Sequence, residues 1–115
     1  MRTKFRVISP HGPETEDVLN VKKGARLKFE RKPTKWEGWL WCTSPDGVSA
    51  WVPEPWVDVK EGHCVMRKDY VSRELTLKPG EEVSGWFTES GWAWVRTAVG
   101  DEGWAPLECL ERMEG

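Results

Sequence analysis

Short apolar runs with a two-residue alternation, separated by Gly, Pro and Asp, follow one another along the whole chain. Such runs are typical of short β-strands joined by tight turns, and no stretch shows the periodicity of an amphipathic helix. We therefore expect an all-β protein. The predicted strands occupy residues 4–8, 18–21, 25–31, 39–43 and 49–53 in the first half, and 64–68, 74–77, 81–87, 92–97 and 103–107 in the second.

The second half of the chain repeats the first. Residues 39–57 coincide with residues 92–110 at an offset of 53. Residues 19–24 meet 75–80 at an offset of 56, and residues 7–11 meet 66–70 at 59, so the first copy has two three-residue insertions. The repeat divides the chain into residues 1–60 and 61–115, and five short strands per copy predict two tandem small five-stranded barrels.

Alternation within one strand of each copy separates an inner from an outer face. In the first copy, Leu40 and Cys42 point one way while Trp39 and Trp41 point the other. Small apolar side chains suit the interior of a narrow barrel, so we expect the tryptophans outside. The equivalent residues of the second copy are Ala93 and Val95, which we expect inside, and Trp92 and Trp94, which we expect outside. The segments PDG (45–47) and VGDEG (99–103) predict the hairpin turn after this strand in each copy.

Composition indicates a binding protein. A unit of this size must bury large side chains efficiently to be stable, but nine tryptophans in 115 residues are too many to bury completely. Some tryptophans should therefore be exposed, as they are at binding surfaces. The net charge of −2 is unevenly divided, since residues 1–60 carry +3 and residues 61–115 carry −5.

Catalytic, metal and membrane signals are missing from the sequence. Three cysteines without a C-x-x-C motif argue against a disulfide framework and a zinc site, and they favour a reducing, cytoplasmic location. No segment is apolar enough for a signal peptide or a membrane span. No nucleophile elbow, paired metal-spaced histidines or phosphate loop is present. We expect a protein that is not an enzyme and that has no cofactor or metal.

Four segments of the second copy give a family resemblance. MRKDY (66–70) looks like the ALYDY motif of SH3 (Src homology 3) domains, and ELTLKPGEEV (74–83) resembles the stretch through their diverging turn. GWAWV (91–95) is similar to their tryptophan strand, and GWAPLECL (103–110) to their G-F-x-P-x-N-Y-V ending. Both copies thus resemble SH3 domains, as in short bacterial proteins that carry a tandem of them.

The resemblance implies an aromatic groove for an extended polyproline II peptide, with acids beside it for a cationic side chain. Ser9 and His11 stand where the first copy should have the ALYDY tyrosines, and Cys109 stands at the terminal tyrosine position of the second copy. The first copy, with its longer acid-bearing loop, is the favoured binding half. The matching site residues are Glu14, Glu16, Asp17, Trp36, Trp39, Trp51, Pro53 and Trp56 in the first copy and Tyr70, Trp92, Trp104 and Pro106 in the second.

Our leading hypothesis is an adaptor module that binds a basic or proline-containing peptide. A structural alternative is that the outward tryptophans join two barrels or two chains, and the sequence does not fix the oligomeric state. A lesser alternative is nucleic-acid binding through the basic segment 22–35, in which aromatic residues are interleaved with Lys and Arg. A cage for methylated lysine built from Trp36, Trp39 and Trp51 is a further possibility.

Overall fold

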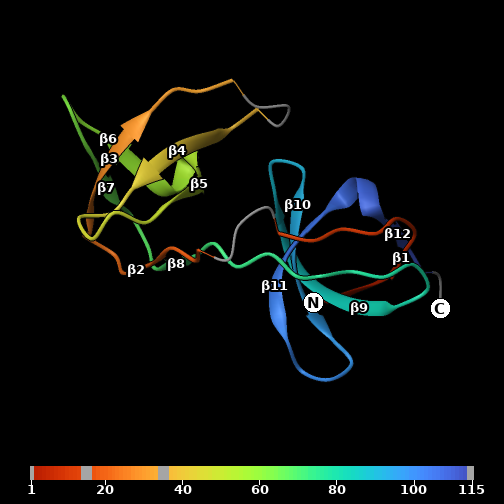
Figure 1. Ribbon diagram of the computed structural model, residues 1–115. Helices are drawn as coiled ribbons and strands as arrows, with labels where there is room; N and C mark the ends of the chain where they lie inside the picture. Colours follow the sequence, from red (N-terminus) through yellow and green to blue (C-terminus); the bar gives the residue numbers. More distant parts are fainter. Residues whose placement is uncertain (1, 14–16, 34–36, 114–115) are drawn as a thin grey trace. The chain divides into compact units, whose positions relative to one another are not determined.

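The computed structural model describes residues 2–13, 17–33 and 37–113, and over these ranges the protein is all-β with two short 3-10 turns. The chain forms two compact units (Figure 1). Residues 16–72 make one of them, here the continuous unit, and residues 1–15 together with 73–115 make the other, here the split unit.

The continuous unit contains a curled five-stranded antiparallel sheet with the strand order β5-β4-β3-β7-β6. Its strands are β3 (Arg26–Glu30), β4 (Trp39–Thr43), β5 (Ser49–Pro53), β6 (Val57–Val59) and β7 (Cys64–Met66). The 3-10 turn η1 (Glu54–Trp56) connects β5 to β6. A small second sheet pairs β2 (Asn20–Val21) with β8 (Tyr70–Val71), which brings the two ends of this unit together.

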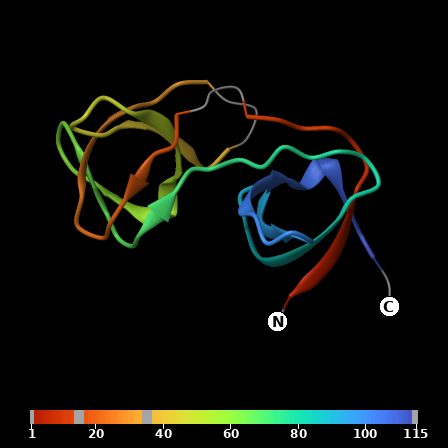
Figure 2. The ribbon, with the colours of Figure 1, turned by 60° about the horizontal axis from the view of Figure 1, so that its bottom comes forward.

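The split unit contains a second five-stranded antiparallel sheet, in the order β11-β10-β9-β1-β12. The strand β1 (Thr3–Val7) lies between β9 (Glu82–Glu89) and β12 (Leu110–Arg112), so the first and last strands of the chain are side by side (Figure 2). The other strands are β10 (Trp92–Thr97) and β11 (Glu102–Pro106), and the 3-10 turn η2 (Leu107–Cys109) precedes β12.

The two copies of the repeat exchange strands: the first copy contributes β1 to the other unit, and the second contributes β7 and β8. Strand β1 comes from the first copy but pairs with β9 and β12 of the second, whereas β7 comes from the second copy and pairs with β3 and β6 of the first. The units therefore differ from the sequential division into residues 1–60 and 61–115. The physical reason is that residues 7–11 and 66–70 are equivalent in the repeat, so either segment suits either sheet.

This exchange also reduces the charge difference between the two parts of the chain. The continuous unit carries ten basic and nine acidic residues, a net charge of +1. The split unit carries seven basic and ten acidic residues, a net charge of −3. Both units are thus closer to neutral than the sequential halves, which weakens any argument from a strong overall field.

The predicted inner face of the tryptophan strand is confirmed in both units. Leu40 and Cys42 are 1% and 0% exposed, and Ala93 and Val95 are both fully covered. Trp39, Trp41 and Trp94 are half-buried, as expected on the outer face of a curled sheet. Trp92 differs, because it is buried although it lies on the outer face. The ring of His11 packs edge-on against it, with 5.5 Å between the ring centroids.

Both predicted hairpin turns are present. Gly47 and Gly100 adopt positive φ angles of 88° and 95°, a conformation that glycine tolerates without strain, and they lie in the turns after β4 and β10. The strand predicted at 74–77 is reduced to isolated bridges at Glu74 and Leu77. The short strands β6, β8 and β12 were not predicted, because two or three residues are too few to show an alternation.

Candidate functional site

The outer face of the β4-β5 hairpin gathers aromatic residues in the continuous unit. The antiparallel register places Trp41 opposite Trp51 and Trp39 opposite Pro53. All three tryptophans are half-buried, while Pro53 is fully buried. The rings of Trp41 and Trp51 meet edge to face, with their centroids 5.1 Å apart. The hairpin therefore presents partly exposed indoles that are held in place by their neighbours.

Tyr70 connects this hairpin to Trp56. Its hydroxyl donates a hydrogen bond of 2.7 Å to the backbone carbonyl of Trp51, and its ring meets that of Trp56 edge to face at 5.5 Å. Tyr70 is 3% exposed and Trp56 is 8% exposed. These contacts join four residues into one set, here called the aromatic row: Trp41, Trp51, Tyr70 and Trp56. Tyr70 and Trp56 are buried, and Trp41 and Trp51 are half-buried.

The strand exchange is what places Tyr70 in this row. In the sequence, the first copy lacks a tyrosine at this position, since His11 stands there, and Tyr70 belongs to the second copy. Because β7 and β8 join the continuous unit, Tyr70 lies with Trp51, Pro53 and Trp56 of the first copy. These four sequence-predicted site residues are therefore in one unit, although the sequence divided them between the two copies.

Two lysine ammonium groups lie over rings of the aromatic row. The Lys32 Nζ atom is 4.3 Å from the ring centroid of Trp41, and the Lys68 Nζ atom is 3.9 Å from that of Trp56. Both lysines are otherwise exposed. A cation over an indole face at an exposed site gains about 0.5–1 kcal/mol, which is enough to favour one side-chain position without fixing it. Neither contact was predicted, because nothing in the sequence indicates which lysine reaches which ring.

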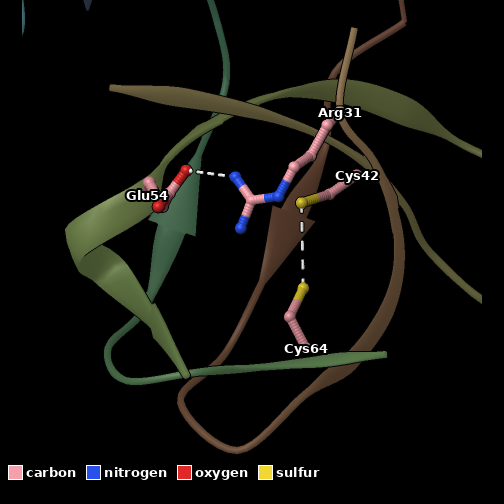
Figure 3. Close-up of polar contacts among 4 residues, drawn as sticks. All are labelled: Arg31, Cys42, Glu54 and Cys64. Atoms are coloured by element: carbon pink, nitrogen blue, oxygen red, sulfur yellow. Dashed lines mark hydrogen bonds and ion pairs between the residues drawn. The ribbon is translucent and has the colours of Figure 1, made fainter. Parts of the chain in front are cut away.

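Some other basic residues of the continuous unit form ion pairs with neighbouring carboxylates. Arg31 donates a hydrogen bond of 2.9 Å to the carboxylate of Glu54 (Figure 3). The Lys22 Nζ atom lies 3.9 Å from a carboxylate oxygen of Asp69. The basic segment 22–35, which the sequence offers as a nucleic-acid site, is thus partly neutralised where the structure describes it. Such exposed pairs add little stability, but they reduce the local positive potential.

The predicted acidic loop lies only partly within the described residues. Glu14, Glu16 and Trp36 lie outside the described residues. Asp17 is described and exposed. The methyl-lysine cage stays a prediction, because Trp36 lies outside the described residues.

The split unit has its own aromatic set, but more of it is buried. Trp104 is 3% exposed and lies at the centre, with the rings of Trp94 and Phe87 packed edge-on against it at 5.5 and 5.6 Å. Pro106 is fully buried and pairs with Trp92 in the sheet. The predicted site residues of this unit thus lie together, yet Trp92 and Trp104 present little surface to a ligand.

Sequence reasoning missed Phe87 and Trp86, which are 44% and 40% exposed. The sheet register shifts between Trp94 and Val95, so that Phe87 faces Trp94 while Gly85 faces Val95. Trp86 is the extra residue of this bulge. A bulge interrupts the two-residue alternation, which is why the sequence pattern could not assign these two residues to a face.

The thiols of Cys42 and Cys64 meet in the interior of the continuous unit. Both residues are fully buried, and their Sγ atoms are 3.8 Å apart (Figure 3). Burial is the largest cause that raises the pKa of each thiol above its usual value. Both groups therefore stay protonated near neutral pH and are poor nucleophiles. Cys109 is also buried and takes part in no disulfide bond.

A separate pocket of about 340 Å³ opens on the split unit. It contains none of the predicted site residues. Its lining is mixed in charge and consists of Arg73, Glu74, Leu75, Thr76, Glu81, Thr97, Ala98, Val99 and Asp101.

Over the described ranges, no three His, Cys, Asp or Glu side chains are grouped as metal ligands. The described part of the chain likewise contains no helix with the length and apolar character needed to cross a membrane. Comparisons with known proteins add no assignment: no model of a protein family, no curated protein and no solved structure matches the chain significantly.

Proposed function

We propose that the chain is a non-catalytic binding protein built from two SH3-like barrels, and that its continuous unit binds an extended, proline-containing peptide along the aromatic row. The sequence resemblance to SH3 domains supports the fold assignment, together with the curled five-stranded sheets and the 3-10 turn before the last strand of each copy. The first copy remains the proposed binding half, and Tyr70 of the second copy joins its aromatic residues in the continuous unit.

The observation that carries this proposal is the connection of Tyr70 to Trp51 and Trp56. Tyr70 holds the backbone of Trp51, and the indoles of Trp41 and Trp51 pack edge to face on each other, so little side-chain entropy is lost when a ligand binds. A polyproline II segment is itself extended before binding, and its flat rings pack well on aromatic faces. A rigid aromatic surface and a stiff ligand suit each other for this reason.

Trp41 and Trp94 offer a matched pair of substitutions for the test. They are equivalent in the repeat, both are half-buried, and each packs edge-on against one further tryptophan. We expect Trp41→Ala to weaken peptide binding about tenfold or more, since a central aromatic contact contributes roughly 2 kcal/mol or more. We expect Trp94→Ala to leave it unchanged, because Trp94 belongs to the split unit.

The measurement is a peptide-array screen, followed by titration of the ¹⁵N-labelled protein with the peptides that bind. Amide and indole signals of Trp39, Trp41 and Trp51 should shift, and the spectra of both variants should remain dispersed. The proposal fails if no extended peptide shifts these signals. It also fails if Trp94→Ala weakens binding as much as Trp41→Ala does.

A further inference from the structure

We propose that the peptide bound by the aromatic row is acidic, with carboxylates that pair with Lys32 and Lys68 on either side of an apolar, proline-containing core. This inference rests on the proposed function and specifies the chemistry of its ligand. It departs from the sequence-based expectation of a basic partner.

The two lysines place their charges over two different rings of the aromatic row. Lys32 lies over Trp41, the first ring of the row, and Lys68 lies over Trp56, the last. The ring contacts favour one position of each ammonium group, so a ligand carboxylate meets a charge that is often already near the ring. An ammonium group over a ring face still has N–H donors directed away from the ring. It can therefore keep its ring contact and bind a carboxylate at the same time.

These two ammonium groups are also available for pairing. Across residues 17–33 and 37–72, neither Lys32 nor Lys68 makes an ion pair, whereas Arg31 pairs with Glu54 and Lys22 with Asp69. Glu30 lies opposite Trp41 in the sheet, but no ion pair joins it to Lys32. The unit thus neutralises some of its surface cations, while the ammonium groups of Lys32 and Lys68 contact rings of the aromatic row instead.

A basic ligand would meet an unfavourable surface. Its cationic side chains would have to displace Lys32 and Lys68 from the ring faces, or bind beside them and be repelled by the like charge.

A nucleic acid is a poorer fit than an acidic peptide. Nucleic-acid affinity depends on many phosphate contacts made by an extended basic surface. The continuous unit has a net charge of only +1, and one of its arginines, Arg31, is paired with Glu54. Two positioned ammonium groups match a few carboxylates along a short segment better than a regular series of phosphates.

The test uses extended synthetic peptides that share a proline-containing core and differ only at two flanking positions, which carry Glu, Gln or Lys. Affinities are measured by titration for the whole protein and for Lys32→Gln, Lys68→Gln and Lys78→Gln. Lys78 is an exposed lysine of the split unit and serves as the matched control. A single-stranded oligonucleotide is titrated in parallel at the same salt concentration.

We expect the Glu peptide to bind best and the Lys peptide worst. Each of Lys32→Gln and Lys68→Gln should weaken binding of the Glu peptide about threefold, the range of exposed ion pairs, and should leave the Gln peptide unchanged. Lys78→Gln should have no effect, and added salt should reduce the preference for Glu.

Tighter binding of the Lys peptide than of the Glu peptide to the unchanged protein, or tighter binding of the Glu peptide after Lys68→Gln, overturns the acidic assignment while the proposed function stands. Failure of all three peptides to bind overturns the proposed function itself. Binding of the oligonucleotide in preference to the Glu peptide overturns the peptide assignment in favour of a nucleic acid.

Discussion

Replacing Val7 by Ala should weaken the split unit and leave the continuous unit intact. Val7 lies at the end of β1 and is 1% exposed. Its side chain belongs to a core that includes Val83, Val95 and Leu110, all contributed by the second copy of the repeat. In a sequential arrangement of residues 1–60 and 61–115, the same substitution would instead damage the core around Leu40.

The expected size of this effect follows from the burial of the side chain. Val7→Ala removes two methyl groups from a fully covered position, which costs about 1.6 kcal/mol in transfer free energy. The cavity left behind adds to this, so we expect a loss of roughly 2–3 kcal/mol in the unfolding free energy of the split unit. A loss of about 2 kcal/mol accelerates exchange through unfolding about thirtyfold, since every 1.4 kcal/mol is a factor of ten.

Amide hydrogen exchange, followed residue by residue by NMR, is the appropriate assay because it reports the local stability of each sheet. Amides of β9 and β10 should exchange faster in Val7→Ala, and those of β4 and β5 should not change. Ile8→Ala is the control, since Ile8 is the next residue but is 47% exposed. Ile8→Ala should leave the amide exchange rates of both sheets nearly unchanged.

Met66→Ala gives the mirror-image test. Met66 is 1% exposed and lies on β7, the strand that the second copy contributes to the continuous unit. Its substitution should accelerate exchange in β4 and β5 and spare β9 and β10. Faster exchange of β4 and β5 in Val7→Ala would refute the strand exchange, and an equal change in both sheets would refute the division into two units.

Two further predictions concern single contacts of the continuous unit. Tyr70→Phe should lower its unfolding free energy by about 1 kcal/mol, because the hydrogen bond to the Trp51 carbonyl is lost, and urea denaturation would measure this; an unchanged midpoint would contradict that bond. The raised pKa values of Cys42 and Cys64 keep both thiols protonated in the folded state, while the unfolded chain loses these protons above pH 9.0, the usual value. The unfolding free energy should therefore be independent of these thiols at lower pH and fall as the pH rises above that value. The double variant Cys42→Ala, Cys64→Ala should show a smaller fall, and an equal fall would contradict the burial of the two thiols.

Local features of the fold were predictable from the sequence because their causes are local. The two-residue alternation of residues 39–42 set the faces of β4, and it correctly placed Leu40 and Cys42 inside. The glycines at 47 and 100 correctly marked the hairpin turns. Strands β4, β5 and β10 have the predicted bounds, since each combines a clear alternation with a turn signal at its end.

The strand exchange was not predictable, because the repeat itself removes the information that would show it. Equivalent segments of the two copies have the same pattern, so no local signal decides whether β1 completes the first sheet or the second. The composition of the candidate site depends on this choice. Tyr70 was assigned to the second copy for that reason, and the lysine contacts to Trp41 and Trp56 depend on loop paths that carry no sequence signature.

The strand exchange is tested most directly by NMR contacts between backbone protons of neighbouring strands. The structure predicts cross-strand nuclear Overhauser effects between Val7 and Leu110, and between Leu27 and Cys64. Contacts of Val7 with Val57, together with contacts of Met66 with Leu110, would show that each copy closes its own sheet, and they would contradict the exchange on which the aromatic row depends.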